Sequence, residues 1–285
     1  MGDGHVHSHD HDHGCCCWSL AVKIALFGFI LVVLWQTKLR YHLKMFFYLL
    51  SLIFGGLIGG LISIPYGRTP KNHFRMFKVF QIINSVLQLN FEIRHKERLE
   101  SEEPFILIAN HQSCMDVLGM TFAWPQNCVV VLKSSLKYLP GFNLCTYLCN
   151  AVYINRFNKE KSKTTVDDTA AAIRDHKRKV WLFPEGTRNP GPTLLPFKKG
   201  AFILAHNAKI PVVCCVFSTH KQFYDWENYR FDDSGHVIGD ILPPIDSTKF
   251  ETVEELSEHC RKVMQTRFDE LNVEIGVSAG DKKSD

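Results

Sequence analysis

Residues Phe105–Asp116 read FILIANHQSCMD. The apolar run Phe105–Ile108 is short and has no helical periodicity, which is typical of a buried strand. Ser113 follows, and an aspartate stands three positions later, the spacing of a helix N-cap and its first turn. The segment therefore predicts a strand that passes through a short polar loop into a helix beginning at about Cys114.

The same pattern of strand, loop and helix continues through residues 91–285. Further strands are predicted at Val129–Leu132, Ala151–Ile154, Val180–Phe183 and Pro211–Phe217. Helices are predicted at Val166–His176, Gly200–Asn207 and Val253–Leu271, the last opened by the capping box Thr252-x-x-Glu255. Nearly continuous apolar strands that alternate with helices predict an α/β fold, with a central mostly parallel or mixed sheet and helices on both faces.

The chain before this domain is apolar and basic. The 285 residues carry a net charge of +4, yet no acidic residue lies between His13 and Phe91. That segment holds eight lysines and arginines, so the remainder of the chain is net acidic. A local basic excess argues against a general nucleic-acid binder and favours a segment that faces anionic lipid.

Two apolar segments, Trp18–Trp35 and Met45–Tyr66, approach the ~20 residues that a spanning helix needs. Aromatic residues that could act as interfacial anchors stand near their ends: Trp18, Trp35, Tyr48 and Tyr66. Residues 18–66 are therefore predicted to form membrane helices. The pairs Gly55/Gly59 and Gly56/Gly60 would let a partner helix approach closely, or let a re-entrant helix bend.

Residues 67–90 are predicted to form an amphipathic interfacial helix. Lys71, Arg75 and Lys78 share one stripe, and the other face carries Phe74, Phe77, Ile82 and Val86. A helix packed on the domain fits the pattern equally well. Residues 1–17 are predicted to be a disordered tail rich in histidine and cysteine, and no metal site is predicted there.

The first candidate site is the loop that holds His111. Asp116 is close enough in sequence to bond one ring nitrogen, which would leave the other as a base of fixed tautomer. Alternatively, Asp116 caps the helix and His111 bonds the backbone, which spacing alone favours. In a third interpretation, Cys114 is a thiol nucleophile activated by His111.

The second candidate site follows the predicted strand Val180–Phe183. Pro-Glu-Gly-Thr-Arg, residues 184–188, precedes a helix that starts after Lys198 and Lys199. A glycine turn, a guanidinium and a helix N-terminus are the ingredients of a phosphate-binding site. Arg156 and Lys133, each just after an apolar run, are further candidate anion contacts.

Four blocks in order resemble the glycerolipid acyltransferases, and most closely the 1-acylglycerol-3-phosphate acyltransferases. The blocks are His111–Asp116, Val152–Arg156, Phe183–Arg188 and Ile210–Val213. Cys214 departs from the family, where the fourth block often has a second proline. This family's first block usually lacks a cysteine, which disfavours Cys114 as a nucleophile.

The resemblance implies transfer of an acyl group from acyl-CoA to the sn-2 hydroxyl of lysophosphatidic acid, giving phosphatidic acid at a membrane. His111 would be the general base and Asp116 its orienting partner. The residues implied in substrate binding are Glu185, Gly186, Thr187, Arg188, Arg156 and Lys133. Glu185 is expected to order its loop rather than touch an anion. No cofactor or metal is implied, and acyl-CoA is a co-substrate.

Two rival functions remain. One is a related acyltransferase that uses glycerol-3-phosphate or another lysophospholipid, and the other is a membrane phospholipid-binding protein without turnover. A serine hydrolase is disfavoured because the chain has no Gly-x-Ser-x-Gly elbow. The C-terminal Lys282-Lys283-Ser284-Asp285 resembles a dilysine retrieval signal, so we expect an endoplasmic-reticulum membrane with a cytosolic catalytic domain.

Overall fold

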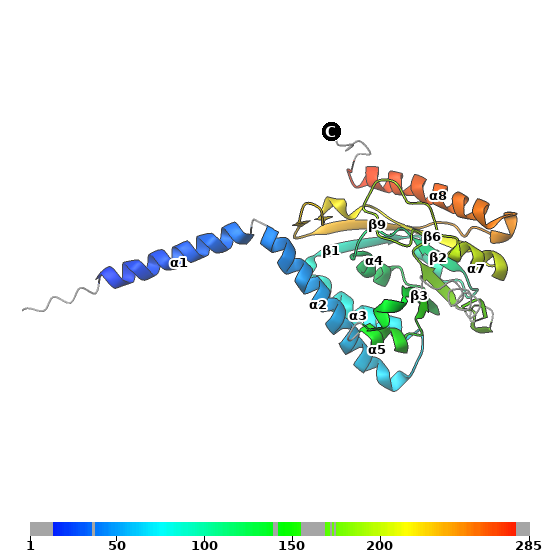
Figure 1. Ribbon diagram of the computed structural model, residues 1–285, viewed down its shortest axis with the longest axis horizontal. Coiled ribbons are helices and arrows are strands. Elements are labelled where there is room, and N and C mark those ends of the chain that lie inside the picture. The colour runs from blue at the N-terminus through cyan, green and yellow to red at the C-terminus, as the bar shows by residue number, and fades with distance from the viewer. Residues whose placement is uncertain are drawn as a thin grey trace, which may run out of the picture. The chain divides into compact units, whose positions relative to one another are not determined.

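The structure is a computed structural model that describes residues 14–35, 38–138, 142–154, 169–171, 173 and 175–277. The chain divides into two units, residues 1–45 and 46–285, and the second contains the whole sheet. Helix α1 spans Gly14–Trp35, and α2 spans Lys38–Ser63 and continues into a 3₁₀ turn at Ile64–Tyr66 (Figure 1). Among the described residues, Lys38–Tyr66 is the one helix that is long and apolar enough to cross a membrane, and Leu20–Val33 is a shorter apolar helix.

The central sheet has seven strands in the order β1-β9-β6-β2-β5-β3-β4. Their bounds are β1 Leu89–Arg94, β2 Ile106–Ala109, β3 Cys128–Lys133, β4 Val152–Ile154, β5 Lys179–Leu182, β6 Val212–Phe217 and β9 Gly235–Ile241. All neighbours are parallel except β6 and β9, so the predicted mixed sheet is confirmed. A separate small sheet pairs β7, Tyr224–Asp225, with β8, Arg230–Phe231.

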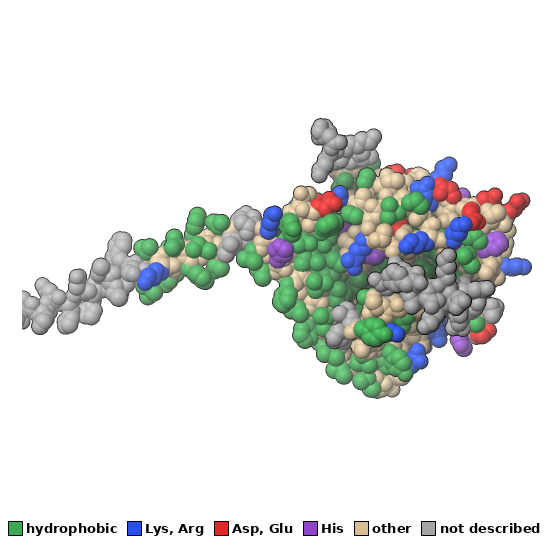
Figure 2. Space-filling model, in the orientation of Figure 1, with side chains coloured by type: hydrophobic (Ala, Val, Ile, Leu, Met, Phe, Trp, Pro, Cys, Tyr) green, Lys and Arg blue, Asp and Glu red, His purple; other side chains and the backbone are tan. Residues whose placement is uncertain are grey.

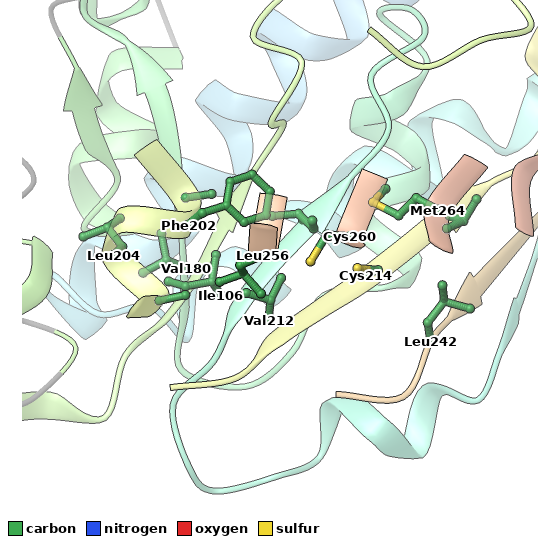
Figure 3. Close-up of a cluster of buried hydrophobic side chains, with 14 of the residues drawn as sticks. Ile106, Val180, Phe202, Leu204, Val212, Cys214, Leu242, Leu256, Cys260 and Met264 are labelled. Atoms are coloured by element: carbon green, nitrogen blue, oxygen red, sulfur yellow. The ribbon is translucent and has the colours of Figure 1, made fainter. Parts of the chain in front are cut away.

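Helices cover both faces of the sheet, as predicted. On one face lie α7, Gly200–Ala208, and α8, Val253–Glu274, which bury Phe202, Leu256 and Met264 against the strands (Figure 3). The other face carries α4, Asp116–Phe122, with α3, Asn72–Asn84, packed against it. A further helix, α5, spans Phe142–Leu148. Short 3₁₀ helices lie at Ser85–Leu87, Lys96–Leu99, Ser134–Tyr138, His220–Gln222 and Ser247–Lys249.

The glycines of α2 let a second helix approach closely, which is the first of the two interpretations that the sequence offered for them. A Cβ added at Gly59 would lie 2.8 Å from Cα of Met76, and one at Gly55 would lie 3.3 Å from a ring atom of Phe80. Met76 and Phe80 belong to α3, so its backbone approaches α2 closely. Larger side chains at these glycines would force the two helices apart.

Helix α3 uses a different face for packing from the one that its apolar pattern indicated. The residues it buries are Asn72, His73, Met76, Phe80 and Asn84. Of the expected apolar face, Phe74, Ile82 and Val86 stay exposed, whereas Phe77 is half-buried against Trp124. Helix α3 therefore packs on the domain through one face and presents apolar side chains on another.

Two local expectations were wrong. Helix α4 begins at Asp116 rather than Cys114, because the backbone N–H of Met115 donates to Ser113 Oγ at 3.0 Å and holds a turn before the helix. Tyr48 is not an interfacial anchor, since it is fully buried and its hydroxyl donates to the carbonyl of Cys114 at 2.8 Å. The predicted helix Val166–His176 lies partly outside the described residues, and so does the predicted tail, of which residues 1–13 are not described. Its last residues, Gly14–Cys17, belong to α1, so the helix begins earlier than predicted.

Candidate active site

Parallel strands bring the sequence-predicted site residues to one edge of the sheet. Because β2, β3, β4, β5 and β6 all run in the same direction, their carboxyl ends meet at this edge. His111 follows β2, the Glu185 loop follows β5, and Lys133 is the last residue of β3. The side chain of Lys133 and the whole of Arg156, which follows β4, lie outside the described residues.

His111 and Asp116 form a close pair. Nδ1 of His111 lies 2.6 Å from Oδ2 of Asp116, and the carboxyl side chain is 1% exposed. The same oxygen accepts the backbone N–H groups of Gln112 at 2.7 Å and Ser113 at 3.0 Å. Asp116 therefore holds the turn and the imidazole together, which is the contact that the first interpretation expects. The second interpretation does not describe this geometry, because the described hydrogen bond of the His111 ring goes to Asp116 and α4 has no side-chain cap.

The pairing fixes which ring nitrogen of His111 can act as a base. A carboxylate accepts hydrogen bonds, so the imidazole proton belongs on Nδ1 and the lone pair on Nε2. The ring stacks on Phe183, with centroids 4.2 Å apart and an interplanar angle of 20°, and its side chain is 22% exposed. An oriented and partly exposed imidazole nitrogen that carries a lone pair can take a proton from a bound hydroxyl.

Glu185 ties the two candidate loops together from inside the protein. Its Oε1 accepts the backbone N–H of His111 at 2.9 Å, and its Oε2 accepts the N–H of Leu195 at 3.0 Å and the amide of Asn189 at 3.1 Å. The backbone N–H of Asn189 donates in turn to the carbonyl of His111 at 2.7 Å. Glu185 is 3% exposed, which fits the expected ordering role.

Gly186 is favoured by its backbone conformation, and the end of a lysine side chain lies close to it. Its φ of +68° is a left-handed conformation that favours glycine, and an added Cβ would lie 2.7 Å from the end of the Lys198 side chain. Lys199 points elsewhere and forms an ion pair with Glu254 of α8. The two adjacent lysines, which the sequence could not distinguish, therefore make different contacts. Lys198, which lies over the candidate loop, is added to the candidate residues.

Arg188 and Thr187 are exposed at the end of this loop. Among the described residues, no carboxylate forms an ion pair with Arg188. Its charge acts on the Cys114 thiol, where burial raises the pKa and Arg188 opposes part of the rise. A buried thiol with a raised pKa stays protonated at neutral pH, which does not favour the nucleophile interpretation.

Two buried amides join the site to β6, and sequence reasoning assigned them no role. Asn110 exchanges two hydrogen bonds of 2.9 Å with the backbone of Phe217. Gln112 donates to the carbonyl of Ser218 at 2.9 Å and accepts the backbone N–H of His220 at 3.1 Å. Both amides lie in the quoted stretch Phe105–Asp116, but only the pairing of β2 with β6 shows which backbone groups they bond.

Comparisons with known proteins show which family this chain resembles. The family model described as Acyltransferase matches residues 90–218. A Caenorhabditis elegans protein named "Putative 1-acyl-sn-glycerol-3-phosphate acyltransferase acl-1" is 58% identical over 82% of this chain and 89% of its own length. The human 1-acyl-sn-glycerol-3-phosphate acyltransferase beta is 35% identical over 75% of this chain and 78% of its own length.

A solved structure shares the fold. The crystal structure of the 1-acyl-sn-glycerophosphate (LPA) acyltransferase PlsC from Thermotoga maritima matches with a TM-score of 0.64, covering 82% of this chain and 97% of that one at 22% identity. The fold, the order of the four blocks and the identity to these relatives agree with one another. The chain therefore belongs to the 1-acyl-sn-glycerol-3-phosphate acyltransferase family.

Proposed function

We propose that this chain transfers a fatty acyl group from acyl-CoA to the sn-2 hydroxyl of lysophosphatidic acid, forming phosphatidic acid and free CoA. The contact of 2.6 Å between His111 and Asp116 is the observation that carries the proposal. It supplies an oriented base on the turn after β2, and Glu185 holds the candidate phosphate-binding loop against that turn. The names and identities of the relatives favour this acceptor.

The reaction proceeds by direct attack. Nε2 of His111 removes the hydroxyl proton while the acceptor oxygen attacks the thioester carbonyl. The C–S bond then breaks, and the CoA sulfur leaves and recovers the proton from His111. Asp116 offsets the positive charge on the ring during the step. General base assistance contributes roughly 10²–10⁴-fold, and positioning of the two substrates contributes much of the rest.

The phosphate of the acceptor binds at the loop after β5. Arg188 offers a planar fork that can form two parallel hydrogen bonds to a phosphate. Gly186 and Thr187 shape the loop around it, and Lys198, which crosses Gly186, adds a second positive charge. Lys133 and Arg156 are further candidate contacts, since Lys133 ends β3 and Arg156 comes two positions after β4 in the sequence.

The membrane supplies both lipid substrates. Apolar side chains gather over α2 (Figure 2), where Phe54, Leu61 and Ile62 are among those exposed. An active site beside the bilayer lets acyl chains stay in lipid and avoids exposing methylenes at ~0.8 kcal/mol each. We assign the chain before α1 to a tail, α1 and α2 to membrane helices, α3 to an interfacial helix, and the chain from β1 onward to the catalytic domain, cytosolic at the endoplasmic reticulum.

An acceptor panel tests the proposed reaction. Purified full-length chain is supplied with acyl-CoA and, separately, lysophosphatidic acid, glycerol-3-phosphate and lysophosphatidylcholine. Preferential formation of phosphatidic acid is expected. Preference for another acceptor would assign a related acyltransferase instead, and absence of product with all three would favour a lipid-binding protein. Protease protection of a C-terminal epitope in sealed microsomes would contradict the cytosolic orientation.

A further inference from the structure

The two oxygens of the Asp116 carboxylate are used very unequally. Oδ2 accepts three hydrogen-bond donors, from the His111 ring and from two backbone N–H groups. Oδ1 is buried and has no hydrogen-bond partner among the described residues. An unsatisfied buried carboxylate oxygen is costly, so the nearest possible donor to Oδ1 is of interest.

That nearest donor is a second histidine, His220. It begins the 3₁₀ turn after β6 and is 2% exposed. Its Nδ1 lies 3.6 Å from Oδ1 of Asp116, slightly longer than a hydrogen bond, and 3.0 Å from Oγ of Ser113. The side-chain oxygen of Gln112 accepts the backbone N–H of His220 at 3.1 Å, so the main chain at His220 is fixed to the turn that carries His111.

The ring of His220 is neutral at physiological pH. Burial lowers its pKa, the charge of Asp116 opposes that effect, and His111 adds to it. A neutral imidazole carries one proton, and the other buried nitrogen, Nε2, has no partner among the described residues. A proton on Nδ1 faces two acceptors: Ser113 Oγ, within hydrogen-bond distance at 3.0 Å, and Asp116 Oδ1, just beyond it at 3.6 Å. A proton on Nε2 would face no acceptor among the described residues.

We propose that His220 is a positioning residue, whose Nδ1–H is directed at Oδ1 of Asp116 and Oγ of Ser113 and keeps Oδ2 against His111. The proposal rests on the proposed function, because it concerns the base of that reaction. It also extends the site beyond the match to the family model, which ends at residue 218.

Other titratable groups surround this carboxylate. Cys114 lies on the same turn, Tyr48 comes from α2, Tyr224 from β7 and Arg188 from the loop after β5. None of these replaces His220 as a donor to Oδ1 among the described hydrogen bonds. A change at His220 therefore acts on Asp116 with these neighbours held constant.

The test compares kcat, KM and the pH profile of kcat for wild type, His220→Phe, His220→Asn and His220→Gln, with acyl-CoA and lysophosphatidic acid. Asn places an amide N–H near the position of Nδ1–H, whereas Gln places it near Nε2. For His220→Phe we expect kcat to fall about tenfold, a part of the ~10²–10⁴-fold that a positioned base contributes, with KM within about twofold. His220→Asn should retain most of kcat.

The acid limb of the pH profile separates positioning from packing. Without the donor at Oδ1, more of the negative charge of Asp116 acts on His111 and favours its protonation, so the limb should move to higher pH in His220→Phe and stay near wild type in His220→Asn. Equal kcat in all variants would overturn the proposal. Equal losses in all three variants with an unmoved limb would also overturn it.

Two controls keep the outcomes distinct. Thermal unfolding midpoints show whether each variant folds, and if His220→Phe does not, the comparison of Asn with Gln carries the test. His111→Ala must lose activity for the proposed function to hold. If His111→Ala is inactive while every His220 variant behaves as wild type, only the role of His220 fails. His95→Asn, which alters the separate His95–Asp240 pair, should leave the limb in place.

Discussion

The backbone N–H of His111 donates to Oε1 of Glu185 at 2.9 Å, so a carboxylate from the loop after β5 fixes the main chain of the loop after β2. Because β2 and β5 are neighbours in the sheet, a buried side chain can span the two loops. This contact relates the geometry of the base to that of the candidate phosphate-binding loop.

Replacing Glu185 by Gln should weaken both loops. An amide nitrogen cannot accept the hydrogen bonds that Oε2 receives from Leu195 and Asn189, and the unmatched donors should cost about 1–3 kcal/mol of stability. The thermal midpoint and kcat should both fall. Glu254→Gln, at an exposed ion pair with Lys199, is the matched control and should change neither. Equal behaviour of the two variants would show that Glu185 does not order the site.

Asp116→Asn should reduce kcat by roughly 10²–10⁴-fold with little change in KM. The amide would present N–H groups to the turn and permit the wrong tautomer of His111. Asp240→Asn is the control, because Asp240 lies 2.6 Å from His95 on the face covered by α8 and touches no candidate site residue. A kcat for Asp116→Asn close to wild type would exclude Asp116 as the orienting partner.

Arg188→Lys should raise the KM for lysophosphatidic acid about tenfold while kcat at saturation changes much less. An ammonium group keeps the charge but cannot reproduce the two parallel hydrogen bonds of the guanidinium. Arg261→Lys, at the helix pair with Glu258, provides the control. An unchanged KM in Arg188→Lys would remove this residue from the phosphate site.

Lys198→Ala and Lys199→Ala form a matched pair of neighbouring substitutions. Lys198 lies over Gly186, so its loss should raise the KM for the phosphorylated acceptor severalfold, and more at low salt than at high salt. Lys199 forms an ion pair with Glu254, so Lys199→Ala should leave the KM for the phosphorylated acceptor unchanged. Equal effects of the two variants would contradict the assignment of Lys198.

The apolar periodicity of the sequence predicted strands β2 to β6 and helix α8 well, but it did not predict the two strands on one side of the sheet, β1 and β9. The five predicted strands, β2 to β6, follow their apolar runs closely, and α8 begins at the predicted cap, where Thr252 Oγ accepts the N–H of Glu255 at 3.2 Å. Strands β1 and β9 were missed because Glu92 and Arg94 interrupt the first, and two glycines and Asp240 interrupt the second. Their pairing depends on each other and on β6, which no local pattern encodes.

The candidate site shows the same division. The spacing of His111 and Asp116 suggested their contact, but spacing could not reveal that Oδ2 takes three donors while Oδ1 takes none. His220 stands 104 positions after Asp116, and only the alignment of β2 with β6 brings it near. The prediction that Tyr48 is an interfacial anchor was wrong because of another contact that is distant in sequence. Its hydroxyl, on α2, donates a hydrogen bond to the carbonyl of Cys114.

The central claim is that an imidazole base, and not a thiol nucleophile, drives acyl transfer. Formation of phosphatidic acid from acyl-CoA and lysophosphatidic acid by purified His111→Ala and Cys114→Ala, measured side by side with wild type, tests it most directly. We predict a loss of at least about 10²-fold for His111→Ala and activity near wild type for Cys114→Ala. Activity near wild type in His111→Ala, or an inactive Cys114→Ala together with an acyl-protein adduct trapped on the wild-type chain, would contradict the account.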